Sequence, residues 1–129
     1  MDNLYSNPTN KTPKVILDER GKLLIEGRSL PEKAAKFYIP IILWLKHLET
    51  KKLLVEINVE YLNTASLKWF RSIFNQISVN DEIKQKTIHW YIDREDEEMQ
   101  EYSNSISKEF TNIVFCFMPA ESKNKDNAE

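Results

Sequence analysis

Glycine, cysteine and histidine are scarce in this chain of 129 residues, and each shortage excludes a class of site. Only Gly21 and Gly27 occur, so there is no glycine-rich loop to cradle a nucleotide phosphate. The single cysteine, Cys116, allows neither an intramolecular disulfide nor a thiolate cluster for zinc. His47 and His89 have no second ligand at metal-binding spacing. We therefore expect no metal, no cofactor and a cytoplasmic location.

The chain also lacks a basic excess and a long apolar run. Its formal net charge is −2 and its pI is about 5.8, whereas nucleic-acid-binding domains commonly have a pI above roughly 9. The longest apolar run, residues 37–45, is far shorter than the ~20 residues that span a bilayer. Residues 1–14 are polar and contain no apolar core of a signal peptide. Neither nucleic-acid binding nor membrane insertion is expected.

What the chain does have is alternating strand and helix patterns, which predict an α/β fold. Period-two alternation predicts strands at residues 15–18, 23–26, 53–59, 87–92 and 112–118. Helical spacing predicts helices at residues 31–49, with a kink at Pro40, at 64–79 and at 95–107. The first two strands flank Gly21 as a hairpin, and the helices between the last three imply parallel pairing. We expect a five-stranded mixed sheet with three helices mainly on one face.

This length suits one domain. The strand and helix patterns place it at residues 14–118, between a flexible N-terminus at residues 1–13 and a disordered polar tail at residues 119–129.

The junction between the strand at residues 53–59 and the helix at residues 64–79 is the strongest candidate site. Asn63 and Thr64 are both good N-cap residues for that helix. Acidic residues are usually favourable in the first turn of a helix. None occurs at positions 61–80, whereas the basic residues Lys68 and Arg71 do occur there. A phosphate on Thr64 would supply the missing negative charge beside free N–H groups and Lys68. From spacing alone, a plain capping role for Thr64 is the commoner one.

Four motifs, spread over roughly residues 14–118, carry a resemblance to a known family. They are GRSLPE at residues 27–32, FYIPI at 37–41 followed by Trp44 and Leu45, YLNT at 61–64 with Ser66 and Lys68, and WYID at 90–93 leading into DEEM at 96–99. The third is the most specific. In these motifs the chain resembles the SiaC family of bacterial regulatory phosphoproteins. That family is similar in shape to the anti-sigma-factor antagonists, so the resemblance implies the same STAS-like fold.

The resemblance implies a phosphorylation-controlled adaptor and not an enzyme. Its unmodified form is expected to bind and promote a diguanylate cyclase; a serine/threonine kinase would phosphorylate Thr64, and a PP2C-type phosphatase would reverse this. Cyclic di-GMP output and biofilm behaviour would follow, and Ser66 would be at most a minor phosphorylation site. The residues expected at the partner-binding surface are Tyr61, Leu62, Asn63, Thr64, Ser66, Lys68, Arg71, Ser29, Leu30, Pro31 and Glu32.

Two other functions remain open at this point. The first is another partner-switching adaptor, whose target would be an anti-sigma-type kinase that controls transcription. The second is a small hydrolase that uses the acidic cluster around Asp93 and Asp96. Acidic residues at the start of a helix are more typical of a solvated helix end. Trp69 lies on a flank of its helix, outside the main apolar stripe, and is a candidate for an exposed partner contact.

Overall fold

The computed structural model describes residues 4–6, 13–29, 34–62 and 64–120, with the backbone alone at 4–6, 29, 34, 61–62 and 64–65. The first six elements are β1 (Leu4–Ser6), β2 (Lys14–Asp18), β3 (Lys22–Ser29), α1 (Ala34–Lys46), β4 (Lys52–Leu62) and α2 (Thr64–Val79). They are followed by β5 (Gln85–Asp93), α3 (Glu97–Glu109) and β6 (Val114–Ala120). No helix in the described residues is long and apolar enough to span a membrane.

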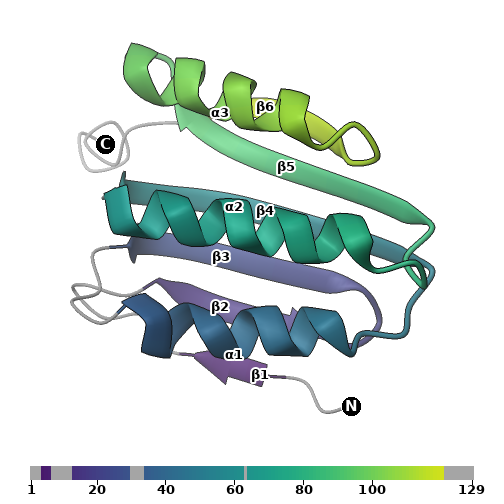
Figure 1. Cartoon of the computed structure of the whole chain (residues 1–129). Helices are drawn as coiled ribbons and strands as arrows, with labels where there is room; N and C mark the ends of the chain where they lie inside the picture. The colour runs from purple at the N-terminus through teal and green to yellow at the C-terminus, as the bar shows by residue number, and fades with distance from the viewer. Residues whose placement is uncertain (1–3, 7–12, 30–33, 63, 121–129) are drawn as a thin grey trace, which may run out of the picture.

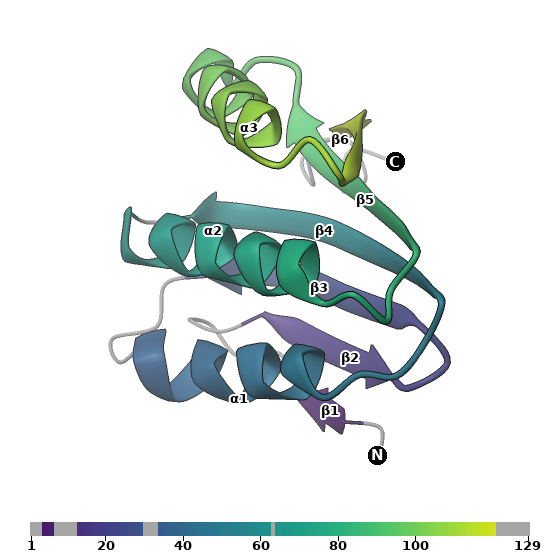
Figure 2. The same ribbon diagram turned by 45° about the vertical axis from the view of Figure 1, so that its right-hand side comes forward.

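The strands form one mixed sheet in the order β1-β2-β3-β4-β5-β6 (Figure 1). β1 and β2 pair antiparallel, as do β2 and β3, whereas β3, β4, β5 and β6 pair parallel. Figure 2 shows the three helices as one layer on a single face of this sheet. The α/β fold class, the hairpin and the parallel pairing of the last three strands are confirmed.

The sheet has one strand more than the five predicted. β1 lies within residues 1–13, for which the sequence predicted no regular structure, and it pairs with β2 so that Leu4 lies opposite Leu17 and Ser6 opposite Val15. Three residues are too few to show the alternation that identifies a strand. β1 is therefore recognised as a strand only by its pairing with β2 in the folded protein.

The predicted helix α2 agrees with the structure at both ends, while α1 ends at Lys46, before the predicted residue 49. The buried side chain of Asn80 explains this end, because its Nδ2 donates to the carbonyls of Leu45 at 2.9 Å and Leu48 at 3.1 Å. These hydrogen bonds satisfy carbonyl groups at the end of α1 that have no donor within the helix. Pro40 lies on the exposed side of a continuous α1, and the predicted start of this helix at Pro31 lies outside the described residues.

The core lies between the helices and one face of the sheet, and an aromatic cluster forms its centre. Trp90 of β5 contacts Phe74 and Phe70 of α2 at ring-centroid distances of 5.5 and 6.1 Å, and Tyr38 of α1 meets Phe70 at 5.8 Å. All four side chains are buried. Burying one large apolar side chain contributes about 1.5–3 kcal/mol, so this cluster holds α1 and α2 on the sheet.

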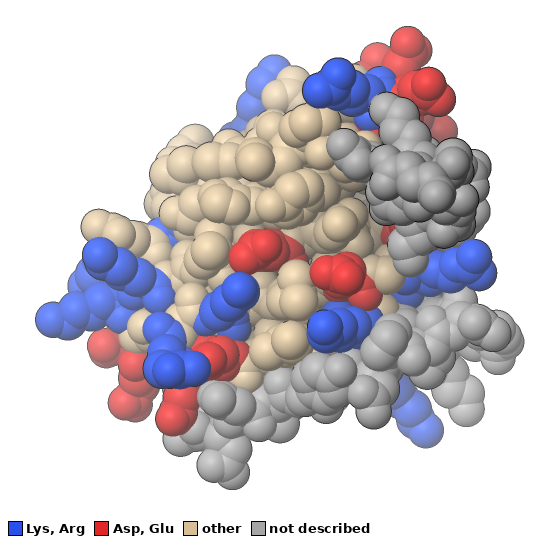
Figure 3. Space-filling model, turned by 180° about the vertical axis from the view of Figure 1, so that it is seen from behind, with Lys and Arg blue, Asp and Glu red and all other residues tan. Residues whose placement is uncertain are grey.

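The opposite face of the sheet carries no helix in the described residues. Figure 3 shows acidic and basic side chains interspersed over one half of this face and mostly uncharged side chains over the half formed by β5 and β6. Lys22 and Glu56 form one ion pair there, with Nζ and Oε1 3.4 Å apart. These strands therefore have one buried face and one comparatively polar face, as is common for a sheet that is covered on one side.

Candidate functional site

The carboxyl ends of the parallel strands β3, β4, β5 and β6 lie along one edge of the sheet, where the described starts of α1, α2 and α3 also lie (Figure 1). Ligands of open α/β sheets commonly bind at this edge. Ser29, the last residue of β3, is the register partner of Leu62, the last residue of β4. The fold therefore brings two of the predicted partner-binding segments side by side, although Ser29 and Leu62 are 33 positions apart in the sequence.

Thr64 is the first residue of α2. The first four N–H groups of a helix have no intrahelical partner, and the helix dipole makes this end attractive to anions. The first turn of α2 contains no acidic residue. Asn63, Leu30, Pro31 and Glu32 lie outside the described residues, as do the side chains of Ser29, Tyr61, Leu62 and Thr64. The backbone alone thus makes the start of α2 suited to a phosphate.

Ser66, the second hydroxyl of the motif, is fully buried at 0% exposure. A kinase must bring its phosphoryl donor within bonding distance of the acceptor oxygen, so a buried hydroxyl is a poor acceptor while the helix stays folded. This burial agrees with the expectation that Ser66 is at most a minor phosphorylation site, which remains a prediction.

Lys68 and Arg71 both lie on the exposed side of α2. Arg71 forms an ion pair across to α3, where its Nε donates to Oε2 of Glu109 at 3.1 Å. The sequence pattern did not predict this partner, because the two residues are 38 positions apart.

Trp69 is partly buried and stacks on Tyr38 of α1, with the ring centroids 6.4 Å apart and the ring planes 13° from parallel. The expectation of an exposed Trp69 is therefore met only in part. Among the described residues, Trp69 packs α2 against α1.

Charge is segregated among the three helices. α1 and α2 contain no acidic residue, whereas α3 begins with Glu97 and Glu98. Lys68 therefore lies on a helix that carries no acidic residue, whereas Arg71 of the same helix is paired with Glu109 of α3.

The acidic cluster before α3 is engaged in helix capping. Asp96 accepts a hydrogen bond from the Met99 N–H at 3.0 Å, as an N-cap does, and Asp93 accepts one from the Glu95 N–H at 2.9 Å. The part of the chain that the structure describes contains no group of three or more His, Cys, Asp or Glu side chains placed to hold a metal ion. These contacts favour a structural role for Asp93 and Asp96 over catalysis.

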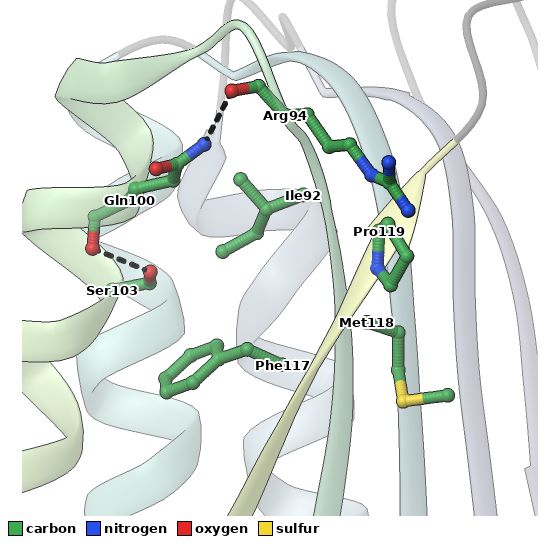
Figure 4. A pocket seen from close by; sticks show the side chains of 7 residues that line it. All are labelled: Ile92, Arg94, Gln100, Ser103, Phe117, Met118 and Pro119. Carbon is green, nitrogen blue, oxygen red and sulfur yellow. Dashed lines mark hydrogen bonds between the residues drawn. The ribbon is translucent and has the colours of Figure 1, made fainter.

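Sequence reasoning missed a pocket of about 300 Å³ at the same edge of the sheet (Figure 4). It lies between α3 and the ends of β5 and β6. The residues that line it are Ile92, Arg94, Gln100, Ser103, Phe117, Met118 and Pro119. No local pattern marks it, because the residues that form it come from segments whose distance in space only the fold sets.

Comparison with solved structures identifies close matches in fold. Apo-SiaC from Pseudomonas aeruginosa matches with a TM-score of 0.80 and 22% sequence identity, covering 92% of this chain and 99% of that chain. A chain in the crystal structure of the diguanylate cyclase SiaD in complex with its activator SiaC, from the same organism, matches with a TM-score of 0.80 and 22% identity, covering 91% and 99%. Comparison with curated proteins gave no match.

The matching family model describes SiaC family regulatory phosphoproteins and covers residues 6–120. Those residues include every described helix and almost every described strand, together with the motif that contains Thr64. This chain belongs to the SiaC family of regulatory phosphoproteins.

Proposed function

We propose that this protein is an adaptor, not an enzyme, that binds and regulates a diguanylate cyclase and is switched by phosphorylation of Thr64. The observation that carries the proposal is the acid-free start of α2 at Thr64 in a member of a regulatory phosphoprotein family. A SiaC chain of the same fold is described as the activator of the cyclase SiaD, with which it forms a complex. A serine/threonine kinase adds the phosphate and a PP2C-type phosphatase removes it, in the cytoplasm, so cyclic di-GMP output and biofilm formation follow the modification.

The phosphate acts at the binding surface and leaves the helix folded. It brings roughly −1.5 to −2 charges to the start of α2, where negative charge stabilises a helix by about 0.3–1 kcal/mol. In the bound state the same charge, if left unpaired in the contact, costs several kcal/mol. Each ~1.4 kcal/mol changes the affinity tenfold, so phosphorylation weakens the affinity for the partner by about a hundredfold. The residues in contact are those of the motif from Tyr61 to Lys68, with Arg71 and the segment of Ser29, Leu30, Pro31 and Glu32 beside them.

Two substitutions of Thr64 test the switch. Thr64→Asp is expected to keep the melting temperature, because a carboxylate in the first turn of a helix is favoured by the helix dipole, and to weaken cyclase binding about a hundredfold. Thr64→Ala changes the first residue within α2, not the residue before the helix that caps it, so it is expected to leave the helix folded and still to bind. Isothermal titration calorimetry with the cyclase and thermal melts measure both quantities.

Asn75→Asp is the matched control, because it adds the same charge on an exposed position of α2 roughly 16 Å further along the helix. It is expected to bind as the unmodified chain does. Equal binding by Thr64→Asp, or weaker binding that follows a collapsed melting curve, contradicts the interface switch.

Phosphosite mapping in the native host tests the site and the partner together. Mass spectrometry of protein from cells that lack the phosphatase is expected to find phosphate chiefly on Thr64. Phosphate chiefly on Ser66 or on Ser122 contradicts the assignment. A pull-down that recovers an anti-sigma-type kinase in place of a cyclase assigns the adaptor to transcriptional control instead.

A further inference from the structure

The pocket between α3 and the ends of β5 and β6 is built to accept an apolar group. Figure 4 shows Ile92 and Phe117 pointing toward α3, whereas the side chain of Arg94 extends away from α3 and ends beside Pro119. The polar side chains of α3 that line the pocket already have partners. Gln100 Nε2 donates to the Arg94 carbonyl at 2.8 Å, and Ser103 Oγ donates to the Gln100 carbonyl at 3.1 Å. The pocket therefore offers apolar walls and few free polar groups.

The pocket opens beside the most exposed apolar side chains of the sheet. β6 is the outermost strand of the sheet. Phe117, 42% exposed, lies on the face toward the helices, whereas Val114 and Met118, 60% and 36% exposed, lie on the other face of the strand. Exposed apolar side chains on an open edge strand are a common feature of protein-docking surfaces. A pocket of about 300 Å³ is at the small end of the range for small-molecule sites and has room for one large apolar side chain.

The segment that leads from β5 into α3, next to the pocket in the sequence, is strongly acidic. Between positions 93 and 101 Arg94 is the one basic residue, and it has no ion pair or hydrogen bond to its guanidinium among the described residues. Because Arg94 is exposed and unpaired, moving it aside costs little. The acidic residues of this segment, all exposed, are Asp93, Glu95, Asp96, Glu97, Glu98 and Glu101.

We propose that this pocket is a docking site for a basic peptide segment of a partner protein. One Leu, Ile, Met or Phe side chain of that segment fills the pocket, and Lys or Arg residues on either side lie against the acidic start of α3. An anionic ligand would meet Arg94 but would be repelled by the carboxylates around it, so charge complementarity favours the basic segment. The site contains none of the residues of the Thr64 switch and does not depend on the proposed cyclase.

A labelled heptapeptide with one Leu between two pairs of Lys (GKKLKKG) is the probe, measured by fluorescence anisotropy with the full chain at low salt. The peptides GKKSKKG and GEELEEG remove the apolar side chain and reverse the charge, and both are expected to bind at least about tenfold more weakly. Glu97→Gln/Glu101→Gln is expected to weaken binding of GKKLKKG about fivefold. Arg94→Ala, which removes the one competing cation, is expected to tighten it.

Glu49→Gln/Glu82→Gln is the matched control, since both carboxylates are exposed at the opposite edge of the sheet, and it is expected to leave binding unchanged. Weaker binding by Arg94→Ala, or tighter binding of GEELEEG, would identify an anion site and overturn the proposal. Equal binding of GKKLKKG and GKKSKKG would overturn the role of the pocket. The double variant Lys123→Glu/Lys125→Glu is expected to bind as the unmodified chain does. Tighter binding to it would make the chain's own tail the occupant, not a partner.

Discussion

Arg71 connects α2 to α3 through its ion pair with Glu109, and this pair makes the role of Arg71 in partner binding measurable. Nε of Arg71 lies 3.1 Å from Oε2 of Glu109, and the two side chains are 47% and 46% exposed. Exposed pairs of this kind contribute about 0.2–1 kcal/mol to stability. For a domain of this size, the loss of such a pair in Arg71→Ala corresponds to a fall of roughly 2 °C in melting temperature.

The expected loss of affinity is larger than the loss of stability. Arginine is enriched among the residues that dominate binding energy, and truncation of such a residue commonly costs about 2 kcal/mol or more. Arg71→Ala is therefore expected to weaken cyclase binding by roughly thirtyfold. Glu109→Gln is the matched variant, because it breaks the same ion pair while it keeps the guanidinium and frees it for the partner. It is expected to lose the same small amount of stability and to bind at least as tightly as the unmodified chain.

Isothermal titration calorimetry with the cyclase and thermal melts on the two single variants and the double variant separate these effects. An unchanged dissociation constant for Arg71→Ala removes Arg71 from the binding surface. An equal loss of affinity in Glu109→Gln would mean that the ion pair acts by holding α3 in place, and the reasoning from a direct contact would be refuted.

Two further predictions concern the ends of elements. Gly21, in the β2–β3 turn, has a φ of +111°, and a Cβ there would overlap the Lys52 carbonyl oxygen, so Gly21→Ala is expected to lose more than about 1 kcal/mol in urea unfolding. Burial lowers the pKa of Lys86, so the unfolded chain binds the proton more tightly and stability is expected to rise as pH approaches the ordinary lysine value of about 10.4. Lys86→Met is expected to abolish that rise without loss of stability at pH 7, because Asn112 Nδ2 still donates to the Ser78 carbonyl at 2.9 Å. A flat pH profile in the unmodified chain, or a Gly21→Ala chain of unchanged stability, contradicts these assignments.

Local patterns in the sequence were sufficient for most of the fold. Helix α2 was predicted from residue 64 to residue 79, as the structure has it, because its apolar spacing and its capping residues lie within one continuous segment. The parallel pairing of the last three strands was likewise predicted, from the helices between them, whereas the order of the strands in the sheet was not. The short strand β1 was missed, since its identity depends on a hydrogen-bonded neighbour and not on its own residues.

The sequence by itself determined which segment is the candidate switch, because the motif and the absence of acidic residues around Thr64 are both local properties. Only the tertiary structure decided what surrounds that segment. It placed Ser29 beside Leu62, paired Arg71 with Glu109 and formed a pocket beside α3. Contacts between segments that are far apart in the chain depend on how helices pack on the sheet, and no residue pattern within a single segment contains that information.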